Sequence, residues 1–249
     1  MTYDLHPKIN VVSSESIQSG YDQVFQKLNE YLIHTKKQIF IFECYPGVDL
    51  QEIFEQLVER FTDVRIVCSD DIALDSASVT SMIAEEMTTD RVFGNMSRQT
   101  FQDFFPIHEL QTMQEDIQNC QNSVIVYGTA ASLLCSDPDL LVYFGITRWE
   151  IQLRYRAGMS NWKANNPSED SLKKFKRGYF FEWRLGDRSR HSLFKNINFY
   201  VDTSVRGIPK MVSGNLLRAC IIKTGQQPFR VVPYFDQSVW GGTMDEVEL

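Results

Sequence analysis

The sequence lacks several features that would assign it to a special class of protein. Its 249 residues contain no apolar run that approaches the roughly 20 residues needed to cross a bilayer. The first residues, Met-Thr-Tyr-Asp, carry no basic patch followed by an apolar stretch, so no secretory signal is visible. With 43% hydrophobic and 23% charged residues, the composition is that of a globular chain. We therefore expect a cytoplasmic protein without membrane contact.

Cysteine and histidine are scarce and scattered. The five cysteines lie far apart and form no Cys-x-x-Cys pair. This pattern is typical of reduced thiols and argues against a disulfide framework. The four histidines show neither His-x-His nor His-Glu-x-x-His spacing, the arrangements that zinc sites commonly use. We expect no metal site, and no zinc, in this chain.

Charge is distributed unevenly along a chain whose net charge is −7. Residues 1–147 contain 8 basic and 22 acidic residues, whereas residues 148–195 contain 12 basic and 5 acidic residues. A basic block inside an acidic protein favours a local anion site over a nucleic-acid surface, so we expect no nucleic-acid partner. The alternative is a solvated basic helix face packed against the acidic half. We expect the aromatic residues interleaved with this block, Trp162 among them, to lie in the core.

Short apolar runs alternate with helical periodicity along the chain. The expected strands are Gln38–Glu43, Val64–Cys68, Ser123–Tyr127, Leu140–Phe144, Ile197–Val201 and Phe229–Val232. The expected helices are Ser16–Ile33, Leu50–Phe61, Val79–Met87, Ile107–Cys120, a short one ending at Cys135, Thr147–Ala157, Ser168–His191 with a break near Gly178 or Gly186, and Ser213–Thr224. Strands that are apolar on both faces and alternate with helices predict a three-layer α/β/α domain with a mainly parallel sheet.

The expected topology also places a ligand site. In sheets of this kind, ligands bind beyond the carboxyl ends of the strands. Four segments should meet at that edge: Tyr45–Asp49, Ser69–Asp71, Gly128–Ala131 and the loop near Gly145–Arg148. Gly128 and Thr129 supply small residues between a strand and a helix N-terminus, which can hold an anion.

The order of these segments resembles the P-loop fold of nucleoside and nucleotide kinases. The resemblance rests on the strand, turn and helix at Gln38–Phe61, on S-V-I-V-Y-G, and on D-L-L-V-Y-F followed by T-R-W-E-I-Q-L-R-Y-R. A phosphate-binding P-loop needs glycines, a lysine and a Ser or Thr. The segment E-C-Y-P-G-V-D-L stands there instead, with one glycine and two acids. We therefore expect a degenerate P-loop that does not carry ATP hydrolysis or phosphoryl transfer.

The end of the chain resembles a second family. The segment Val232–Glu246, V-P-Y-F-D-Q-S-V-W-G-G-T-M-D-E, is similar to the opening of class I mannose-6-phosphate isomerases. Together with D-R-V-F-G, N-W-K, F-K-R-G-Y-F-F-E-W-R and P-K-M-V-S-G, it makes the whole chain resemble the N-terminal, kinase-like module of longer bacterial proteins of that class. The resemblance implies a kinase-like α/β domain over residues 1–226. It also implies that residues 227–249 are the first strand of a cupin module, whose zinc ligands have no counterpart here.

Candidate binding residues follow from the sheet edge and the basic block. Asp70 and Asp71 end a strand, where the kinase resemblance implies a base or a Mg²⁺ ligand and where a simple turn is the alternative. Basic side chains on a lid above the edge suit a phosphate. The candidate ligand-binding residues are Tyr45, Gly47, Asp70, Asp71, Gly128, Thr129, Arg148, Arg154, Lys163, Arg177, Arg184 and Arg188. No catalytic residue is assigned.

Three functions remain open at this point. The leading hypothesis is a module of a class I mannose-6-phosphate isomerase-like protein of carbohydrate metabolism, non-catalytic on its own and binding a phosphorylated small molecule. The first alternative is a divergent nucleoside or sugar kinase, which implies a nucleotide with Mg²⁺ as cofactor. The second is a structural partner domain for a cupin module or chain, in which the apolar segment Val231–Trp240 seeks a partner.

Overall fold

The computed structural model of the chain describes residues 8–11, 13–32 and 36–227, which fall into two compact units. One unit comprises Glu15–Gly214, and the other combines the chain up to Ser14 with the chain from Asn215 onward. The expected strand Phe229–Val232 and the isomerase-like segment Val232–Glu246 lie outside the described residues.

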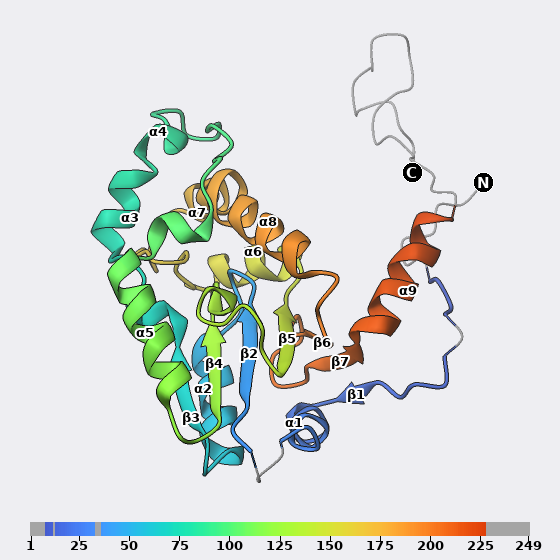
Figure 1. The fold of residues 1–249 in the computed structure, drawn as a ribbon. Helices are drawn as coiled ribbons and strands as arrows, with labels where there is room; N and C mark the ends of the chain where they lie inside the picture. The colour runs from blue at the N-terminus through green and yellow to red at the C-terminus, as the bar shows by residue number, and fades with distance from the viewer. Residues whose placement is uncertain (1–7, 12, 33–35, 228–249) are drawn as a thin grey trace, which may run out of the picture. The chain divides into compact units, whose positions relative to one another are not determined.

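A seven-stranded sheet forms the centre of the larger unit, in the order β1-β7-β6-β5-β2-β4-β3 (Figure 1). The strands are β1 (Gln18–Ser19), β2 (Ile39–Cys44), β3 (Arg65–Cys68), β4 (Val124–Gly128), β5 (Leu140–Gly145), β6 (Phe199–Asp202) and β7 (Lys210–Ser213). Strands β3, β4, β2, β5 and β6 run parallel, with Ile39 opposite Val124 and Phe40 opposite Leu140. The hairpin partners β6 and β7 are antiparallel, as are β7 and β1.

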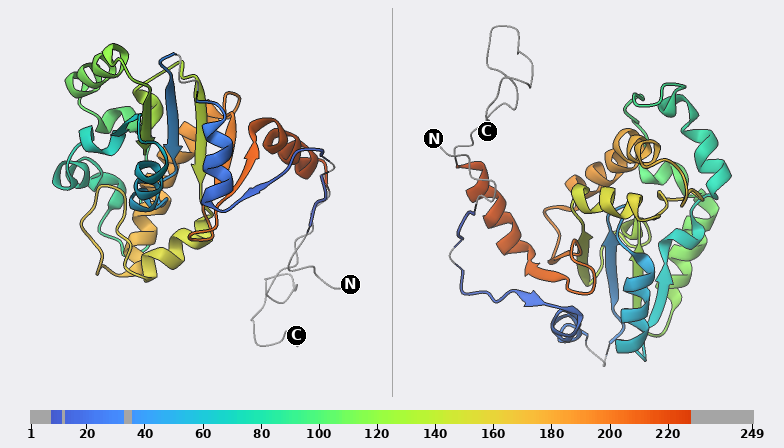
Figure 2. Two further views of the ribbon diagram at one scale, coloured as in Figure 1. Left: turned by 90° about the horizontal axis from the view of Figure 1, so that it is seen from below. Right: turned by 180° about the vertical axis from the view of Figure 1, so that it is seen from behind.

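Helices cover both faces of this sheet. The helices of the described residues are α1 (Tyr21–Asn29), α2 (Leu50–Arg60), α3 (Ser76–Met82), α4 (Ala84–Met87), α5 (Ile107–Asn119), α6 (Arg148–Arg156), α7 (Ser171–Arg177), α8 (Trp183–Leu193) and α9 (Gly214–Gly225). Short 3-10 turns occur at η1 (Ser69–Ile72), η2 (Phe101–Phe104) and η3 (Ala131–Leu133), and a π-helical turn, η4 (Gly178–Glu182), joins α7 to α8. Helix α5 lies over the face seen in Figure 1, and α2 over the opposite face, seen from behind in Figure 2.

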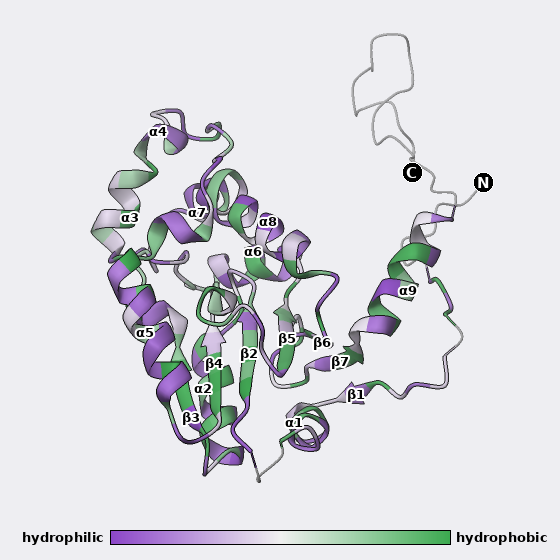
Figure 3. Cartoon of the chain, in the orientation of Figure 1, coloured by the Kyte–Doolittle hydropathy of each residue, from purple (hydrophilic) through white to green (hydrophobic). Residues whose placement is uncertain are grey.

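The core is built on the three central strands. Every residue of β2, β4 and β5 is buried, and these strands are the hydrophobic centre of the sheet in Figure 3. The ring of Phe42 in β2 lies 5.4 Å from that of Phe144 in β5 and 6.3 Å from that of Phe25 in α1. Strands apolar on both faces need helices on both sides to exclude water, as the sequence predicts.

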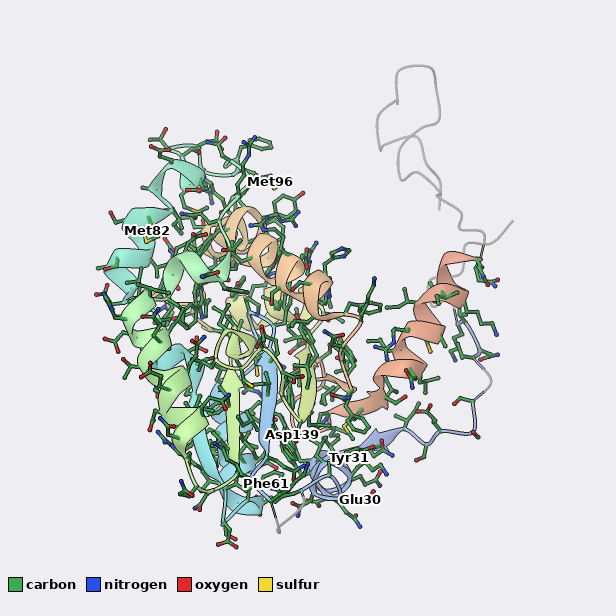
Figure 4. All side chains as sticks on the ribbon, viewed as in Figure 1. Glu30, Tyr31, Phe61, Met82, Met96 and Asp139 are labelled. Atoms are coloured by element: carbon green, nitrogen blue, oxygen red, sulfur yellow. The ribbon has the colours of Figure 1, made fainter. Side chains whose placement is uncertain are left out.

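The fold class predicted from the sequence is therefore confirmed: a three-layer α/β/α domain with a mainly parallel sheet. The first parallel strand, β2, is central and leads through a tight turn into α2. At the amino ends of the strands, the carboxylate of Asp139, labelled in Figure 4, accepts a hydrogen bond from the N–H of Ile39 at 2.9 Å. No helix among the described residues is long and apolar enough to cross a membrane.

The start of the chain corrects one sequence prediction. The helix expected over Ser16–Ile33 begins only at Tyr21, because Gly20 has φ of 84° and ψ of 156°, which no α-helix contains. The two residues before Gly20 pair instead with β7, a strand that the sequence analysis did not predict. Only Met211 of β7 is buried, so this strand lacks the apolar run that marks the central strands.

Two helical predictions also needed adjustment. The helix expected over Val79–Met87 is two short helices, α3 and α4, divided at Ile83. The long helical segment expected over Ser168–His191 is not broken at Gly178, which has helical φ and ψ. The helix instead passes into the π-helical turn at this point and continues as α8 to Leu193.

Candidate functional site

A cleft opens at the carboxyl ends of the parallel strands, the edge at which the sequence places the ligand site. Its volume is about 850 Å³, which is typical of small-molecule sites. The lining residues are Gly47, Val48, Asp49, Leu50, Asp70, Thr129, Glu150, Leu153, Arg154, Ala157, Met159, Ser160, Trp162, Lys163 and Arg206. The candidate residues that meet in this cleft are Gly47, Asp70, Thr129, Arg154 and Lys163.

The turn after β2 forms one wall of the cleft. Side chains of the protein itself fill the space beside this turn and bond its backbone groups. Gly47 has φ of 106°, and a Cβ atom there would lie 2.7 Å from Cγ1 of Ile151. The Asp49 carboxylate caps α2 by accepting a hydrogen bond from the N–H of Glu52 at 3.2 Å. The Arg154 guanidinium donates to the carbonyl of Gly47 at 3.3 Å. A carboxylate thus occupies the helix N-terminus, where a P-loop would present its N–H groups to a phosphate.

Asp70 is the centre of the hydrogen bonds on the opposite wall. Its Oδ2 accepts from the N–H of Thr129 at 2.7 Å, and its Oδ1 accepts from Nε1 of Trp162 at 2.6 Å. The Lys163 ammonium donates to the carbonyl of Asp70 at 2.6 Å. Burial raises the pKa of Asp70 above its usual value, although these donors and the Lys163 charge oppose the rise. Asp70 therefore ties the ends of β3 and β4 to the segment after α6.

Gly128 allows this arrangement by its small size. It has φ of 126°, and a Cβ atom there would lie 2.5 Å from Oγ of Ser69 and 2.7 Å from Oδ2 of Asp70. The Ser69 hydroxyl in turn donates to the carbonyl of Thr129 at 2.9 Å. Gly128 and Thr129 thus hold Asp70 in place, with Thr129 reaching the cleft.

The charged groups in the cleft balance. Three cations, Arg154, Lys163 and Arg206, face three carboxylates. Arg154 donates through Nε to Glu150 at 2.9 Å and through Nη2 to the carbonyl of Thr203 at 2.9 Å, so most of its donors are used. Arg206 is 71% exposed and pairs with Asp49 at 2.7 Å, a type of surface pair that contributes little to stability. Lys163 and Arg206 are thus the cations best placed to meet a ligand.

An apolar wall completes the cleft. It consists of Leu50, Leu153, Met159 and Trp162. The indole of Trp162 packs edge-on against Phe101 at 5.4 Å between ring centres, which fixes it while its N–H reaches Asp70. The cleft therefore offers an apolar surface beside polar groups, the usual composition of a small-molecule site.

Three further candidate residues meet elsewhere, around Asp187 of α8. The Tyr45 hydroxyl donates to Oδ1 of Asp187 at 3.0 Å, and Arg148 pairs with the same carboxylate. Arg184 lies 4.0 Å from it, and Arg190 lies 3.0 Å from it. Tyr45, Arg148 and Arg184 thus share one aspartate and do not line the cleft.

The remaining candidates have backbone partners or face solvent. Arg177 donates to the carbonyls of Trp162 and Lys163 at 3.3 and 3.2 Å. Arg188 donates to the carbonyls of Ser97 and Gln99. Asp71 is exposed on η1.

Two lysines of the basic block are buried in the same way. The Lys174 ammonium donates to the carbonyls of Tyr155, Met159 and Pro167 at 3.2, 3.0 and 2.6 Å. The Lys176 ammonium donates to the carbonyls of Met87 and Asp90. Much of the basic block therefore holds loops in place by bonding neutral backbone oxygens.

Some site residues have no signal in the sequence that identifies them. Arg206 and Glu150 reach the cleft from the β6–β7 loop and from α6. Trp162 was expected in the core, and it is largely buried, yet its N–H makes the contact to Asp70. The role of Trp162 at Asp70 cannot be predicted from its neighbours in the sequence, because the two residues are 92 positions apart. Among the described residues, no group of three or more His, Cys, Asp or Glu is placed to hold a metal ion.

Glu43, near the end of β2, is a second feature that the sequence analysis did not single out as a candidate. The residue is 1% exposed. It accepts hydrogen bonds from the N–H of Ser132 at 2.8 Å and from the hydroxyl of Ser189 at 3.2 Å. Burial raises its pKa to about 7, because these bonds only partly replace the lost water.

Comparison with known proteins gives a family and a distant structural neighbour. The family described as "Domain of unknown function (DUF8485)" matches residues 20–226. No curated protein sequence matches the chain. A solved structure, that of shikimate kinase from Bacteroides thetaiotaomicron, is similar with a TM-score of 0.39 and 10% identity, over 67% of this chain and 87% of that one.

Proposed function

Because the chain belongs to the family described as a domain of unknown function, DUF8485, we propose a function from the cleft itself. The chain is a kinase-like module that binds a phosphorylated small molecule and transfers no phosphoryl group. The observation that carries this proposal is the closed turn after β2, in which Asp49 caps α2 and Arg154 bonds Gly47. A carboxylate at this helix end repels a triphosphate, by an amount on the order of 1 kcal/mol or more per close pair of charges.

The ligand group is inferred from the cations that can reach it. Lys163 has three N–H donors, one of which bonds the Asp70 carbonyl. Arg206 pairs with Asp49 only at the surface, and a phosphate can compete for it. Bonds from Arg and Lys to phosphate oxygens are charge-assisted and stronger than neutral ones. The apolar wall of the cleft then contacts the rest of the ligand.

We propose further that this module belongs to a class I mannose-6-phosphate isomerase-like protein of carbohydrate metabolism. This part rests on the resemblance of Val232–Glu246 to the opening of those isomerases. A sugar phosphate is then the expected ligand, and a cupin module or chain is the expected partner.

The test compares ligand binding by the chain and two cleft variants. Mannose 6-phosphate, fructose 6-phosphate, ADP and ATP with Mg²⁺ are titrated by calorimetry and thermal shift. A ligand at 100 times its dissociation constant raises stability by about 2.7 kcal/mol, which a thermal shift detects. We expect sugar phosphate to bind, and Lys163→Met and Arg206→Ala to weaken it about tenfold or more each, the loss of one bond to a charged group.

The matched control is Lys195→Met, which removes an exposed lysine outside the cleft and should leave binding unchanged. Equal weakening by Lys163→Met and Lys195→Met would show that binding is elsewhere. Phosphoryl transfer from ATP that is lost in Asp70→Asn would overturn the non-catalytic assignment and favour the divergent kinase. A stable complex with a cupin chain, without any small ligand, would favour the structural partner domain.

A further inference from the structure

A second pocket of the larger unit lies between the turns η2 and η3 and helix α8, and none of its described lining residues lines the cleft. We call it the η2–α8 pocket. Its volume is about 280 Å³, close to the lower limit of small-molecule sites, so its ligand must be small. The lining residues are Thr100, Phe101, Gln102, Ala130, Ser132, Leu133, Leu185, Arg188, Ser189 and Ser192.

Four of these lining residues carry a hydroxyl group. The Ser189 hydroxyl donates to Oε1 of Glu43 at 3.2 Å, and that of Ser192 donates to the carbonyl of Ser189 at 2.8 Å. The Thr100 hydroxyl donates to Oδ2 of Asp103 at 3.1 Å. These hydroxyls use their single protons inside the protein, but each oxygen also has two lone pairs. The pocket therefore offers acceptors to the hydroxyl groups of a ligand.

A buried carboxyl group holds two of the lining residues in place. Glu43 is 1% exposed and does not line the pocket itself. It accepts hydrogen bonds from the N–H of Ser132 at 2.8 Å and from the Ser189 hydroxyl. Burying a carboxyl group is costly for the fold, because such bonds only partly replace the lost water. Binding sites use groups of this kind to fix the orientation of the side chains that touch a ligand.

The charges around the η2–α8 pocket leave no positive excess. Among the described residues that line it, Arg188 alone is charged. The carboxylates of Asp103 and Asp187 attract this guanidinium, whereas Arg184 repels it. Glu43 adds a further carboxyl group beneath the lining serines. An anion therefore gains nothing from the net charge, and a cation is repelled by Arg188, so an uncharged ligand fits best.

We propose that the η2–α8 pocket is a second binding site, for an uncharged polyhydroxylated molecule of about the size of a monosaccharide. Hydroxyl groups of the ligand donate to the oxygens of the lining serines and of Thr100. They accept from the Gln102 amide and from Arg188, which has five N–H donors, two of which bond backbone carbonyls. Phe101 and Leu185 contact the apolar face of the ligand. This inference is independent of the proposed function of the cleft.

Two alanines allow the two sites to be observed separately. Ala130 lines the η2–α8 pocket, and Ala157 lines the cleft. In the full chain labelled with ¹³C at the alanine methyl groups, their NMR signals are assigned with Ala130→Gly and Ala157→Gly. The probes are mannose, myo-inositol and cyclohexanol, which has the ring of myo-inositol but a single hydroxyl group. They are titrated at pH 8, where Glu43, with its pKa of about 7, is ionised, and mannose 6-phosphate is titrated as the cleft ligand.

We expect the Ala130 signal to shift with mannose or myo-inositol and not with cyclohexanol, while Ala157 stays still with all three. Ser192→Ala should raise the midpoint of the Ala130 shift about fivefold, the loss of one neutral hydrogen bond. The matched control is Ser81→Ala, which removes an exposed hydroxyl on α3 outside the pocket and the cleft. It should leave the midpoint unchanged.

Glu43→Gln tests whether the buried carboxyl group orients the lining serines. The amide can donate to the Ser189 oxygen, which then turns its proton toward the pocket and no longer accepts from a ligand. We expect the midpoint to rise about fivefold or more in a variant that still unfolds cooperatively in urea, and Glu115→Gln to leave it unchanged.

Three results would overturn this proposal: an Ala130 signal that ignores both mannose and myo-inositol, an equal response to cyclohexanol, or equal effects of Ser192→Ala and Ser81→Ala. A shift of Ala157 with mannose 6-phosphate in the same samples would leave the cleft proposal intact. A Glu43→Gln variant that binds as well as the parent chain would overturn the orienting role of Glu43.

Discussion

Glu43 shows how one residue can make stability depend on pH. Burial raises its pKa from 4.5 to about 7, so the folded state holds a proton that the unfolded state has released. The free energy of unfolding therefore falls as pH rises from about 4.5 to about 7 and levels off above that. At 1.36 kcal/mol for each pKa unit, the loss amounts to about 3 kcal/mol.

We predict that Glu43→Gln removes this dependence. The neutral amide keeps an oxygen for the N–H of Ser132 and an N–H₂ group for the hydroxyl of Ser189. At pH 8 the variant should be more stable than the parent chain, by up to about 3 kcal/mol, and at pH 5 the two should be close. Urea unfolding at both pH values measures the difference.

The control for this residue is Glu115→Gln, a change at an exposed position on α5. It should alter the free energy of unfolding by less than about 0.5 kcal/mol at either pH. If Glu43→Gln lowers stability at pH 8 as much as at pH 5, the carboxyl group of Glu43 is ionised in the folded state throughout.

At the scale of elements, α7 illustrates what a sequence pattern can and cannot predict. The sequence spacing of Lys173, Arg177, Arg184 and Arg188 predicts a single basic stripe. The π-helical turn at Gly178–Glu182 adds about one residue to a turn between Arg177 and Arg184, which rotates the later arginines away from that stripe. The positions of the basic residues are known from the sequence. The backbone carbonyls to which these residues donate cannot be predicted from it, because every residue has a carbonyl.

For α7, we predict that the stability of the fold depends on Lys174. It is fully buried, and its ammonium bonds three carbonyls of the segment that precedes α7. Lys174→Met keeps most of the side-chain volume but leaves these acceptors unsatisfied, each at a cost of about 1 kcal/mol or more. We expect the free energy of unfolding to fall by about 3 kcal/mol, measured by urea denaturation.

The neighbouring Lys173→Met is the matched control, since Lys173 is exposed on the same helix. It should change stability by less than about 0.5 kcal/mol. Similar losses in both variants would mean that α7 depends on general charge rather than on the carbonyl contacts of Lys174.

The strands and the sheet edge were the most predictable elements. Runs such as Ile39–Cys44 are apolar on both faces, so sequence alone indicates a buried strand and hence a parallel sheet. The same logic placed Gly47, Asp70 and Thr129 at one edge, and the cleft lies there. The short strands β1 and β7, and side chains that arrive from distant loops, such as Arg206, could not be predicted because no local pattern marks them.

At the scale of the whole chain, the core lies within one unit. The buried cluster extends from Tyr21 to Met211, and the entire sheet falls inside Glu15–Gly214. We predict that a chain of residues 15–214 folds alone and unfolds in one cooperative transition. Its midpoint should lie within about 5 °C of that of the full chain, since a 1 kcal/mol change in a domain of this size shifts it by about 2–4 °C.

Circular dichroism recorded during heating measures the cooperativity of unfolding and its midpoint temperature, with the full chain as the reference. A broad, non-cooperative transition in the shorter chain would show that residues beyond Gly214 or before Glu15 are part of the folding unit.

The lysine–carbonyl contacts have a consequence for behaviour in acid. Acid protonates carboxylates and so weakens the ion pairs they make, but a backbone carbonyl carries no proton to gain in this range. The contacts of Lys174 and Lys176 therefore persist at a pH that abolishes the carboxylate pairs. As solutions become more acidic, the ion pairs should weaken first, while the lysines of α7 keep their bonds to the carbonyls of two loops.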